Sequence, residues 1–202
     1  MLDRFYLIID RAAWLPRFLP LGLKLVQIRT KAPNIETRRR EIADALALCK
    51  AAGAMCVVND HWQEAIEFGA EWLHLGQEDL DTADLKAIRK AGIRFGVSTA
   101  NREELDRALA VDPDHVALGP IWSTVSKEDA APASGPELLT EWKRITRKPL
   151  VAIGGISLDR APICWGAGAD SVAVISDVLS AASPEARLTE WLDAARTWEA
   201  RA

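Results

Sequence analysis

The sequence lacks the marks of several classes of protein. Its three cysteines, Cys49, Cys56 and Cys164, match neither a zinc knuckle nor a Cys-x-x-Cys redox pair, so we expect reduced packing residues. The first apolar run stops at Asp10, too early for a signal-peptide core, and no run is long enough to span a membrane. With 25 basic and 29 acidic residues, the net charge of −4 gives no basic excess for nucleic acid or a membrane surface. We therefore expect a cytoplasmic protein that acts on small molecules, as a monomer or a homo-oligomer.

Nucleotide-binding and nucleophile signatures are also missing. No Gly-x-Gly-x-x-Gly follows the first predicted strand, and nothing resembles a kinase P-loop. No Ser-His-Asp, Cys-His or paired-glutamate arrangement stands out. Any phosphorylated substrate is therefore expected to arrive already phosphorylated.

A regular alternation of short apolar runs and helical patterns fills the chain. Its 202 residues, 49% of them hydrophobic, suffice for one core, so we predict a single domain over residues 1–202. Alternation favours a parallel sheet, and eight units indicate a closed (β/α)8 TIM barrel of the α/β class rather than an open doubly wound sheet. The predicted strands are Phe5 to Asp10, Leu25 to Arg29, Met55 to Asn59, Trp72 to Leu75, Arg94 to Ser98, His115 to Leu118, Leu150 to Ile153 and Ser171 to Ile175.

Helical spacing and glycine caps predict the crossovers between these strands. Two prolines between Arg11 and Leu23 predict a short or irregular first crossover. The segment from Ser123 to Pro136, rich in Ala, Ser and Pro, is too long for an ordinary turn and is predicted to be a mobile lid. The predicted helices are Thr37 to Ala52 ending at Gly53, Thr82 to Ala91 ending at Gly92, Glu103 to Leu109, and Leu158 to Trp165 ending at Gly166.

Polar side chains gather where the strands end, which is where barrels of this kind carry their functional groups. Gln27, Arg29 and Lys31 are two residues apart and should share a face of the second strand. Two cations and an amide suit a phosphate or pyrophosphate, although a solvated strand end is the alternative. Asp60 and Asp79 follow consecutive strands and are a candidate Mg2+ pair; alternatively they are loop or cap residues.

Two further positions are candidates for a site. Gly154 and Gly155 end the seventh strand and Ser176 follows the eighth, where such barrels hold a phosphate; a tight turn is the alternative. His74 lies within an apolar strand and is interpreted as a barrel-interior histidine without a catalytic role.

These residues lie in segments that resemble the thiamine phosphate synthase family in both order and spacing. The resemblance runs from the second to the eighth predicted strand. Its segments are Gln-Ile-Arg-Thr-Lys at 27–31, Val-Asn-Asp at 58–60, His-Leu-Gly-Gln-Glu-Asp-Leu at 74–80, Gly-Val-Ser-Thr at 96–99, Leu-Gly-Pro-Ile-Trp-Ser-Thr-Val-Ser-Lys at 118–127, Ala-Ile-Gly-Gly-Ile at 152–156 and Ser-Val-Ala-Val-Ile-Ser at 171–176.

The resemblance implies a Mg2+-dependent transferase that joins a pyrimidine methyl pyrophosphate to a thiazole phosphate by dissociative substitution. It implies that Asp60 and Asp79 hold Mg2+, and that Arg29, Lys31, Ser98 and Lys127 serve catalysis. The implied ligands of the pyrimidine pyrophosphate are Gln27, Arg29, Lys31, Asn59, Ser98 and Lys127, and those of the thiazole phosphate are Thr124, Ser126, Gly155, Ile175 and Ser176.

Three positions depart from the family pattern, and two other functions stay open. Ser126 stands where the family usually has Thr, Thr30 where it usually has Glu, and Ser123 where Pro is common. A thiazole phosphate tautomerase would bind the same phosphate but would need neither both aspartates nor the Arg-Lys pair. A non-catalytic ligand-binding regulator would take up ligand without turnover.

Overall fold

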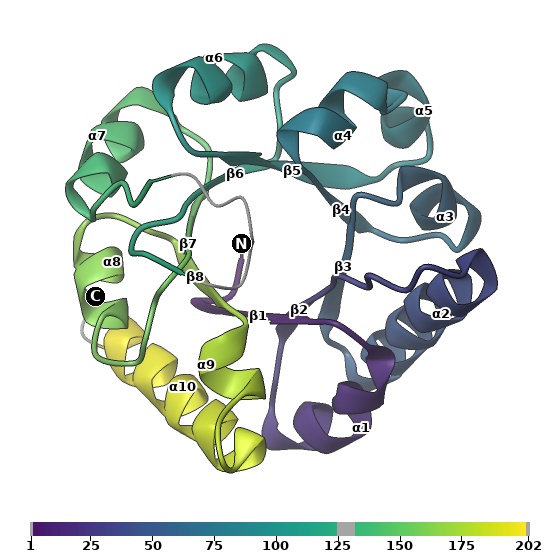
Figure 1. Ribbon diagram of the computed structural model, residues 1–202, viewed down its shortest axis with the longest axis horizontal. Coiled ribbons are helices and arrows are strands. Elements are labelled where there is room, and N and C mark those ends of the chain that lie inside the picture. Colours follow the sequence, from purple (N-terminus) through teal and green to yellow (C-terminus); the bar gives the residue numbers. More distant parts are fainter. Residues whose placement is uncertain (1, 125–131, 201–202) are drawn as a thin grey trace.

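Eight parallel strands close into a barrel, and the helices surround it (Figure 1). The computed structural model describes residues 2–124 and 132–200. The first and last strands pair in parallel, with Phe5 opposite Val172 and Leu7 opposite Val174, so the sheet has no open edge. The predicted (β/α)8 barrel is therefore confirmed. The strands are β1 (Phe5–Ile9), β2 (Leu25–Ile28), β3 (Met55–Asn59), β4 (Trp72–Leu75), β5 (Arg94–Thr99), β6 (His115–Leu118), β7 (Leu150–Ile153) and β8 (Ser171–Val174).

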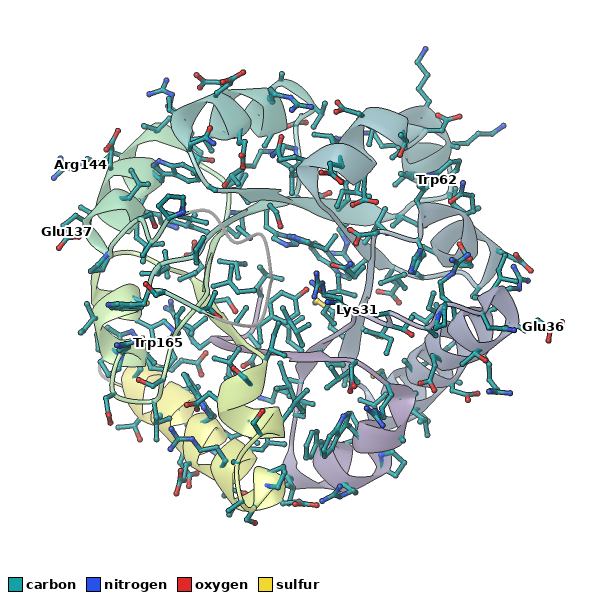
Figure 2. All side chains as sticks on the ribbon, viewed as in Figure 1. Lys31, Glu36, Trp62, Glu137, Arg144 and Trp165 are labelled. Carbon is teal, nitrogen blue, oxygen red and sulfur yellow. The ribbon has the colours of Figure 1, made fainter. Side chains whose placement is uncertain are left out.

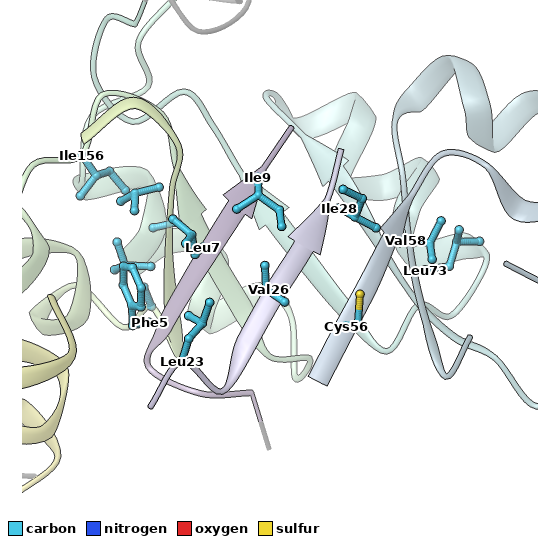
Figure 3. Close-up of a cluster of buried hydrophobic side chains, with 14 of the residues drawn as sticks. Phe5, Leu7, Ile9, Leu23, Val26, Ile28, Cys56, Val58, Leu73 and Ile156 are labelled. Carbon is cyan, nitrogen blue, oxygen red and sulfur yellow. The ribbon is translucent and has the colours of Figure 1, made fainter. Parts of the chain in front are cut away.

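The strands are buried on both faces, which explains their nearly continuous apolar sequences. Phe5, Leu7 and Ile9 of β1 belong to the large cluster between barrel and helices, part of which Figure 3 shows on β1, β2 and β3. The alternate residues Tyr6 and Ile8 belong to a smaller cluster with residues of other strands inside the barrel. Strand alternation thus separates a helix-facing core from a barrel interior.

The helices begin and end largely where their capping signals predict. The Asn34 side chain accepts hydrogen bonds from the backbone N–H of Glu36 and Thr37, at 2.8 and 3.1 Å, so α2 begins two residues before the predicted Thr37. The helices are α1 (Leu15–Phe18), α2 (Ile35–Ala52), α3 (Trp62–Glu67), α4 (Gln77–Thr82), α5 (Leu85–Lys90), α6 (Arg102–Ala110), α7 (Glu137–Ile145), α8 (Ala161–Gly166), α9 (Ser176–Leu179) and α10 (Pro184–Glu199).

The first crossover is short and irregular, as predicted. It consists of two 3-10 turns, Ala12–Trp14 and Leu19–Leu21, on either side of α1. Pro16 and Pro20 each lie in the first turn of their segment, where the missing backbone N–H costs nothing.

Two helix predictions are wrong in their bounds. The predicted helix from Thr82 to Ala91 starts too early, because α5 begins at Leu85, where the Asp84 side chain caps it by accepting from Ala87 N–H at 3.0 Å. Thr82 instead ends the separate helix α4, whose first turn carries the favourable acidic residues Glu78 and Asp79. Asp79 consequently lies on a helix and not in a loop. The predicted start of α8 at Leu158 is too early, because Pro162 fits only a first helical turn; the left-handed residue at its end is Gly168 and not Gly166.

The predicted lid from Ser123 to Pro136 is described only at its ends, because residues 125–131 lie outside the described part of the chain. The backbone N–H groups of Ser134 and Gly135 donate to the carbonyls of Pro120 and Ile121, at 2.9 and 3.1 Å. No helix within the described ranges is long and apolar enough to cross a membrane.

Candidate active site

A cavity of about 830 Å3 lies at the C-terminal ends of the strands. This volume suits a small organic molecule or two. A second cavity of about 420 Å3 adjoins it and shares Ile8, Arg29 and Ile175 with it. Every strand contributes to the larger cavity, through residues that include Tyr6, Gln27, Asn59, Asp60, His74, Gln77, Asp79, Ser98, Ala117, Thr124, Gly154, Gly155, Ala173 and Ser176.

The β2 side of the cavity carries the predicted cations. Gln27 is buried and its amide Nε2 donates to the Tyr6 hydroxyl at 2.8 Å, while Arg29 lines both cavities. Lys31 lies beyond the end of β2, is exposed, and lines the smaller cavity. Figure 2 shows Lys31 projecting over the middle of the ring of strands, whereas Glu36, Glu137 and Arg144 point outward. The predicted shared face therefore holds for Gln27 and Arg29, whereas Lys31 places a further positive charge in the adjoining cavity.

The β3 and β4 sides bring the two predicted metal ligands together. A Cβ on Gly76 would lie 2.9 Å from Asp79 Oδ2 and 4.0 Å from Asp60 Oδ1, so the two carboxylates flank this glycine. Asp60 Oδ1 accepts from Gly76 N–H at 3.3 Å, and Asn59 Nδ2 donates to Asp60 Oδ2. Burial, and then the negative charge of Asp79, raise the pKa of Asp60 to about 6.

This carboxylate pair fits a hard divalent cation. Its oxygen donors are the type that Mg2+ prefers, and a cation there would offset the repulsion that raises the pKa of Asp60. The described residues form no cluster of three or more His, Cys, Asp or Glu able to hold a metal. A cation at this pair would therefore need further oxygens from water or a bound ligand, as Mg2+ usually does beside phosphates.

The β4, β5 and β6 sides carry a hydrogen-bonded network. His74 Nε2 lies 2.8 Å from Ser98 Oγ, and His74 Nδ1 lies 3.4 Å from His115 Nε2. Burial, with the nearby Arg29 charge, lowers the pKa of His74 to about 4; burial, with His74 beside it, lowers that of His115 to about 3. Both rings are therefore neutral at neutral pH. His74 is an interior histidine, as predicted, but it also lines the cavity and supports a predicted ligand.

The β6 and β7 sides form a close-packed glycine loop. Gly154 and Gly155 have φ values of 98° and 63°, in the left-handed region. A Cβ on Gly154 would come within 2.5 Å of Pro120, and one on Gly155 within 2.6 Å of the Ser123 carbonyl oxygen. Both positions therefore require glycine, because space and backbone conformation each exclude a side chain. A backbone this close to the cavity can present its N–H groups to an anion.

The β8 side ends in the predicted short helix. Ser176 is the first residue of α9 and lines the cavity next to Asp177. The Asp177 carboxylate accepts from Arg187 Nε at 2.9 Å and from Trp191 Nε1 at 2.6 Å. Its charge is thus paired on the α10 side, which reduces its repulsion of an anion in the cavity.

The structure brings most of the predicted site residues to one cavity. Ser126 and Lys127 lie among residues 125–131, outside the described part of the chain. Lys31 lines the adjoining cavity. The predicted residues that line the larger cavity are Gln27, Arg29, Asn59, Asp60, Asp79, Ser98, Thr124, Gly155, Ile175 and Ser176.

Sequence reasoning missed several groups at this site. Tyr6 lines the cavity and His115 lies behind His74; both belong to apolar strands, where only their alternation with helix-facing residues marks them as interior. Gln77 lines the cavity and donates through Nε2 to the Ser98 carbonyl at 2.6 Å. Its position directly after β4 was a usable signal, because polar residues at strand ends are the candidates in this fold.

Comparison with known proteins agrees with this arrangement. The family described as thiamine monophosphate synthase matches residues 5–178. This chain belongs to that family. A thiamine-phosphate synthase of Rhizobium etli is 50% identical over 198 residues, which cover 98% of this chain and 97% of the relative. One of Neisseria meningitidis serogroup A is 44% identical over 184 residues, covering 91% and 90%.

A solved structure of the same family has the same fold. The thiamine phosphate pyrophosphorylase from Pyrococcus furiosus superposes with a TM-score of 0.85 at 26% identity, covering 96% of both chains. The family resemblance of the sequence motifs is thereby confirmed over nearly the whole barrel.

Proposed function

We propose that this chain is a thiamine phosphate synthase, a transferase that joins a pyrimidine methylene to the nitrogen of a thiazole phosphate and releases pyrophosphate. The observation that carries the proposal is a cavity with the Arg29 cation and a carboxylate pair on one side and a glycine loop on the other. The relatives named thiamine-phosphate synthase support the synthase over the tautomerase, as does the presence of Asp60, Asp79 and Arg29 together.

The carboxylate side would take the pyrophosphate. Asp60 and Asp79 would hold Mg2+, which when bound supplies positive charge that stabilises a leaving pyrophosphate. Arg29 lines the cavity and can donate two parallel hydrogen bonds to phosphate oxygens, with Lys31 as a further cation at the mouth. Lys127 is proposed to add a charge from the segment outside the described residues.

The barrel interior would take the pyrimidine ring. The Tyr6 hydroxyl holds the amide nitrogen of Gln27, and the amide oxygen of Gln27 is the atom that would accept from an amino group of a ligand. Asn59 and Ser98 line the same wall and supply further polar contacts. Ala117, Val151 and Ala173 line the cavity from the barrel interior and offer an apolar surface to the ring.

The glycine-loop side would take the thiazole phosphate. Backbone at Gly154 and Gly155 and the hydroxyls of Thr124, Ser126 and Ser176 suit a phosphate monoester. Ile175 lines the cavity beside Ser176 and can contact the thiazole ring. The two substrates would then meet over the middle of the barrel mouth.

The reaction needs positioning and charge rather than a protein nucleophile. Pyrophosphate leaves the pyrimidine methylene, the aminopyrimidine stabilises the resulting cation, and the thiazole nitrogen attacks it. A leaving pyrophosphate carries roughly three negative charges, and Arg29, Lys31 and Lys127 supply preorganised positive charge where those charges develop. The chain's contribution is to hold the two substrates in line and to exclude water from the pyrimidine carbocation.

Product formation from the two phosphorylated substrates tests the proposal. Purified protein is incubated with the pyrimidine pyrophosphate, the thiazole phosphate and Mg2+, and thiamine phosphate is detected as its fluorescent thiochrome derivative. Product that EDTA abolishes and excess Mg2+ restores is expected. Binding of both substrates without product would instead favour the tautomerase or the regulator.

We also propose that residues 1–202 act as one domain, because helices from both ends of the chain pack together around the same barrel. The C-terminal helix α10 contacts β1, and it also contacts α1. The cytoplasmic location and the oligomeric state stay predictions.

A further inference from the structure

A second histidine lies behind the one that lines the cavity. His115 on β6 is fully buried, and its ring stacks on that of His74 at a centroid separation of 5.5 Å and an interplanar angle of 25°. Its Nε2 faces His74 Nδ1 at 3.4 Å, while its Nδ1 is buried without a hydrogen-bond partner among the described residues. His115 does not line the cavity, so any effect on a ligand passes through His74 and Ser98.

The neighbouring strand makes room for this ring. A Cβ on Gly96 of β5 would overlap His115, coming within 2.5 Å of its Cδ2 and closer still to its Nε2. The φ of Gly96 is not positive, so its backbone conformation alone does not demand glycine. Glycine at this position is therefore explained by the close approach of the ring across the strand pair.

Only two tautomer arrangements allow a hydrogen bond between the two neutral rings. In the first, His115 Nε2–H donates to His74 Nδ1, and His74 Nε2–H donates to Ser98 Oγ. In the second, His74 Nδ1–H donates to His115 Nε2, and Ser98 donates to His74 Nε2. The second leaves a buried N–H on His115 Nδ1 without an acceptor and puts both rings in the Nδ1–H form, which a neutral imidazole disfavours.

We infer that His115 is a positioning residue that holds His74 in its Nε2–H tautomer and thereby turns the Ser98 hydroxyl proton toward the substrate. In this arrangement the Ser98 oxygen already accepts from His74, so its own proton is free to donate into the cavity. The inference rests on the proposed function for the identity of the acceptor, an oxygen of the leaving pyrophosphate. A hydrogen bond to that oxygen strengthens as negative charge develops on it.

The tautomers of the wild-type protein test the first half of the inference without any activity measurement. The chain has three histidines, so 15N-histidine labelling gives three ring signals, assigned with His61→Gln and His115→Phe. Long-range 1H–15N correlation at pH 7.5 is expected to show protonated Nε2 and bare Nδ1 on both His74 and His115. A protonated Nδ1 on either ring would overturn the inference.

Kinetics test the second half. His115→Phe keeps a planar ring but removes the donor, and is expected to lower kcat/KM for the pyrimidine pyrophosphate about tenfold, the size of one misdirected hydrogen bond, with KM for the thiazole phosphate unchanged. His115→Gln keeps an amide N–H that can reach His74 and is expected to restore most of the loss. Equal losses in both variants, or an equal rise in both KM values, would indicate a structural role only.

A double variant separates transmission through Ser98 from a local packing effect. If His115 acts through Ser98, His115→Phe should cost nothing further in a Ser98→Ala background, whereas independent effects would multiply. The outcomes remain distinguishable from failure of the proposed function: an inactive wild-type protein with both rings in the Nε2–H form would reject the reaction and keep the tautomer assignment. An active protein with a protonated Nδ1 on either ring would keep the reaction and reject the tautomer assignment.

Discussion

Asp60 is the most constrained single residue in the cavity. Its backbone has a φ of 62°, a left-handed conformation that Asp tolerates better than most residues. Its carboxylate accepts from Gly76 N–H and Asn59 Nδ2 while lying beside Asp79. Strain and like charge at one residue are unfavourable for folding, and the cation proposed to bind there would offset the like charge.

Replacing either carboxylate should therefore strongly reduce Mg2+-dependent turnover without unfolding the protein. We expect Asp60→Asn and Asp79→Asn each to lower kcat about 100-fold, the usual cost of losing one preorganised charge contact. Asp81→Asn is the matched control, because Asp81 is exposed and pairs with Arg107 away from the cavity. Near-wild-type rates in both cavity variants, measured by product formation against Mg2+ concentration, would reject the metal assignment.

Sequence reasoning identified those site residues that lie just after the end of a predicted strand. Arg29 and Asp60 follow apolar strands directly, Asp79 lies four residues after the end of β4, and parallel strands bring such ends together. His115 was missed because it begins a buried strand, and the other two members of its network, His74 and Ser98, lie 41 and 17 residues away in the chain. Their contact depends on the register of three strands, which local patterns do not specify.

At the scale of elements, the register of β5 on β6 determines which side chains can meet inside the barrel. Gly96 pairs with His115 in that register, and Ser98 with Ala117. Small residues alternate with large ones here, as the tapering interior of a small barrel requires. A change in side-chain size on β5 should therefore disturb the packing of the paired residue on β6.

Gly96→Ala is expected to destabilise the protein by about 2 kcal/mol, because the added methyl group overlaps the His115 ring. His115→Ala should relieve the overlap, so a double-mutant cycle measured by urea unfolding should give a favourable coupling of about 1 kcal/mol or more. Gly166→Ala is the matched control: its nearest neighbour would be Trp198 at 3.8 Å, an ordinary contact. Additive effects of Gly96→Ala and His115→Ala would contradict this packing explanation.

The loops after β6 and β7 are joined by one exposed side chain. Arg160 Nη1 donates to the Gly155 carbonyl at 2.6 Å, and its guanidinium lies over the Trp122 ring, 5.0 Å from the centroid. This contact adds to the backbone hydrogen bonds from Ile121 and Trp122 N–H to the carbonyls of Ile153 and Gly154, both 3.0 Å, which join the glycine loop to the loop that leads to Thr124. A looser glycine loop should bind phosphate less well, because its backbone N–H groups are then less preorganised.

Arg160→Gln should consequently raise KM for the thiazole phosphate about fivefold, corresponding to about 1 kcal/mol for one tethering contact, and leave KM for the pyrimidine pyrophosphate unchanged. Arg144→Gln on α7 serves as a control, since Arg144 points outward from the barrel (Figure 2). Steady-state kinetics with each substrate varied in turn distinguish the two KM values. A parallel rise in both would argue against a role confined to the glycine loop.

At the scale of the whole molecule, closure of the barrel buries polar side chains that no local element could shield. His115 and His74 are surrounded by other strands, and burial keeps both rings neutral. Unfolding returns them to water, where an ordinary histidine takes up a proton near pH 6.5. The free energy of unfolding therefore depends on pH through the protonation of these two buried histidines.

Acidification should lower the free energy of unfolding. The folded pKa of His115, about 3, lies below the unfolded value, so between pH 3 and 6.5 the unfolded chain binds a proton that the folded chain does not. This contribution is fully present above pH 6.5 and is lost as the pH falls; by pH 5.5 the loss amounts to about 1 kcal/mol. Urea unfolding at pH 7.5 and 5.5 should therefore show a pH dependence smaller by about that amount in His115→Phe than in the wild-type protein. Equal dependence in the two proteins would contradict the buried neutral state of His115.

The sequence by itself determined the alternation of strands and helices, the closed parallel barrel and the residues at each strand end, because these depend on local periodicity and on the rules of parallel connection. Only the tertiary structure decided what those residues meet. Barrel closure and strand register brought Asp60 to Asp79 around Gly76, moved Lys31 to the adjoining cavity, and stacked His115 on His74 behind Ser98. These contacts join side chains from different strands, and their geometry depends on the packing of the complete barrel rather than on any one segment.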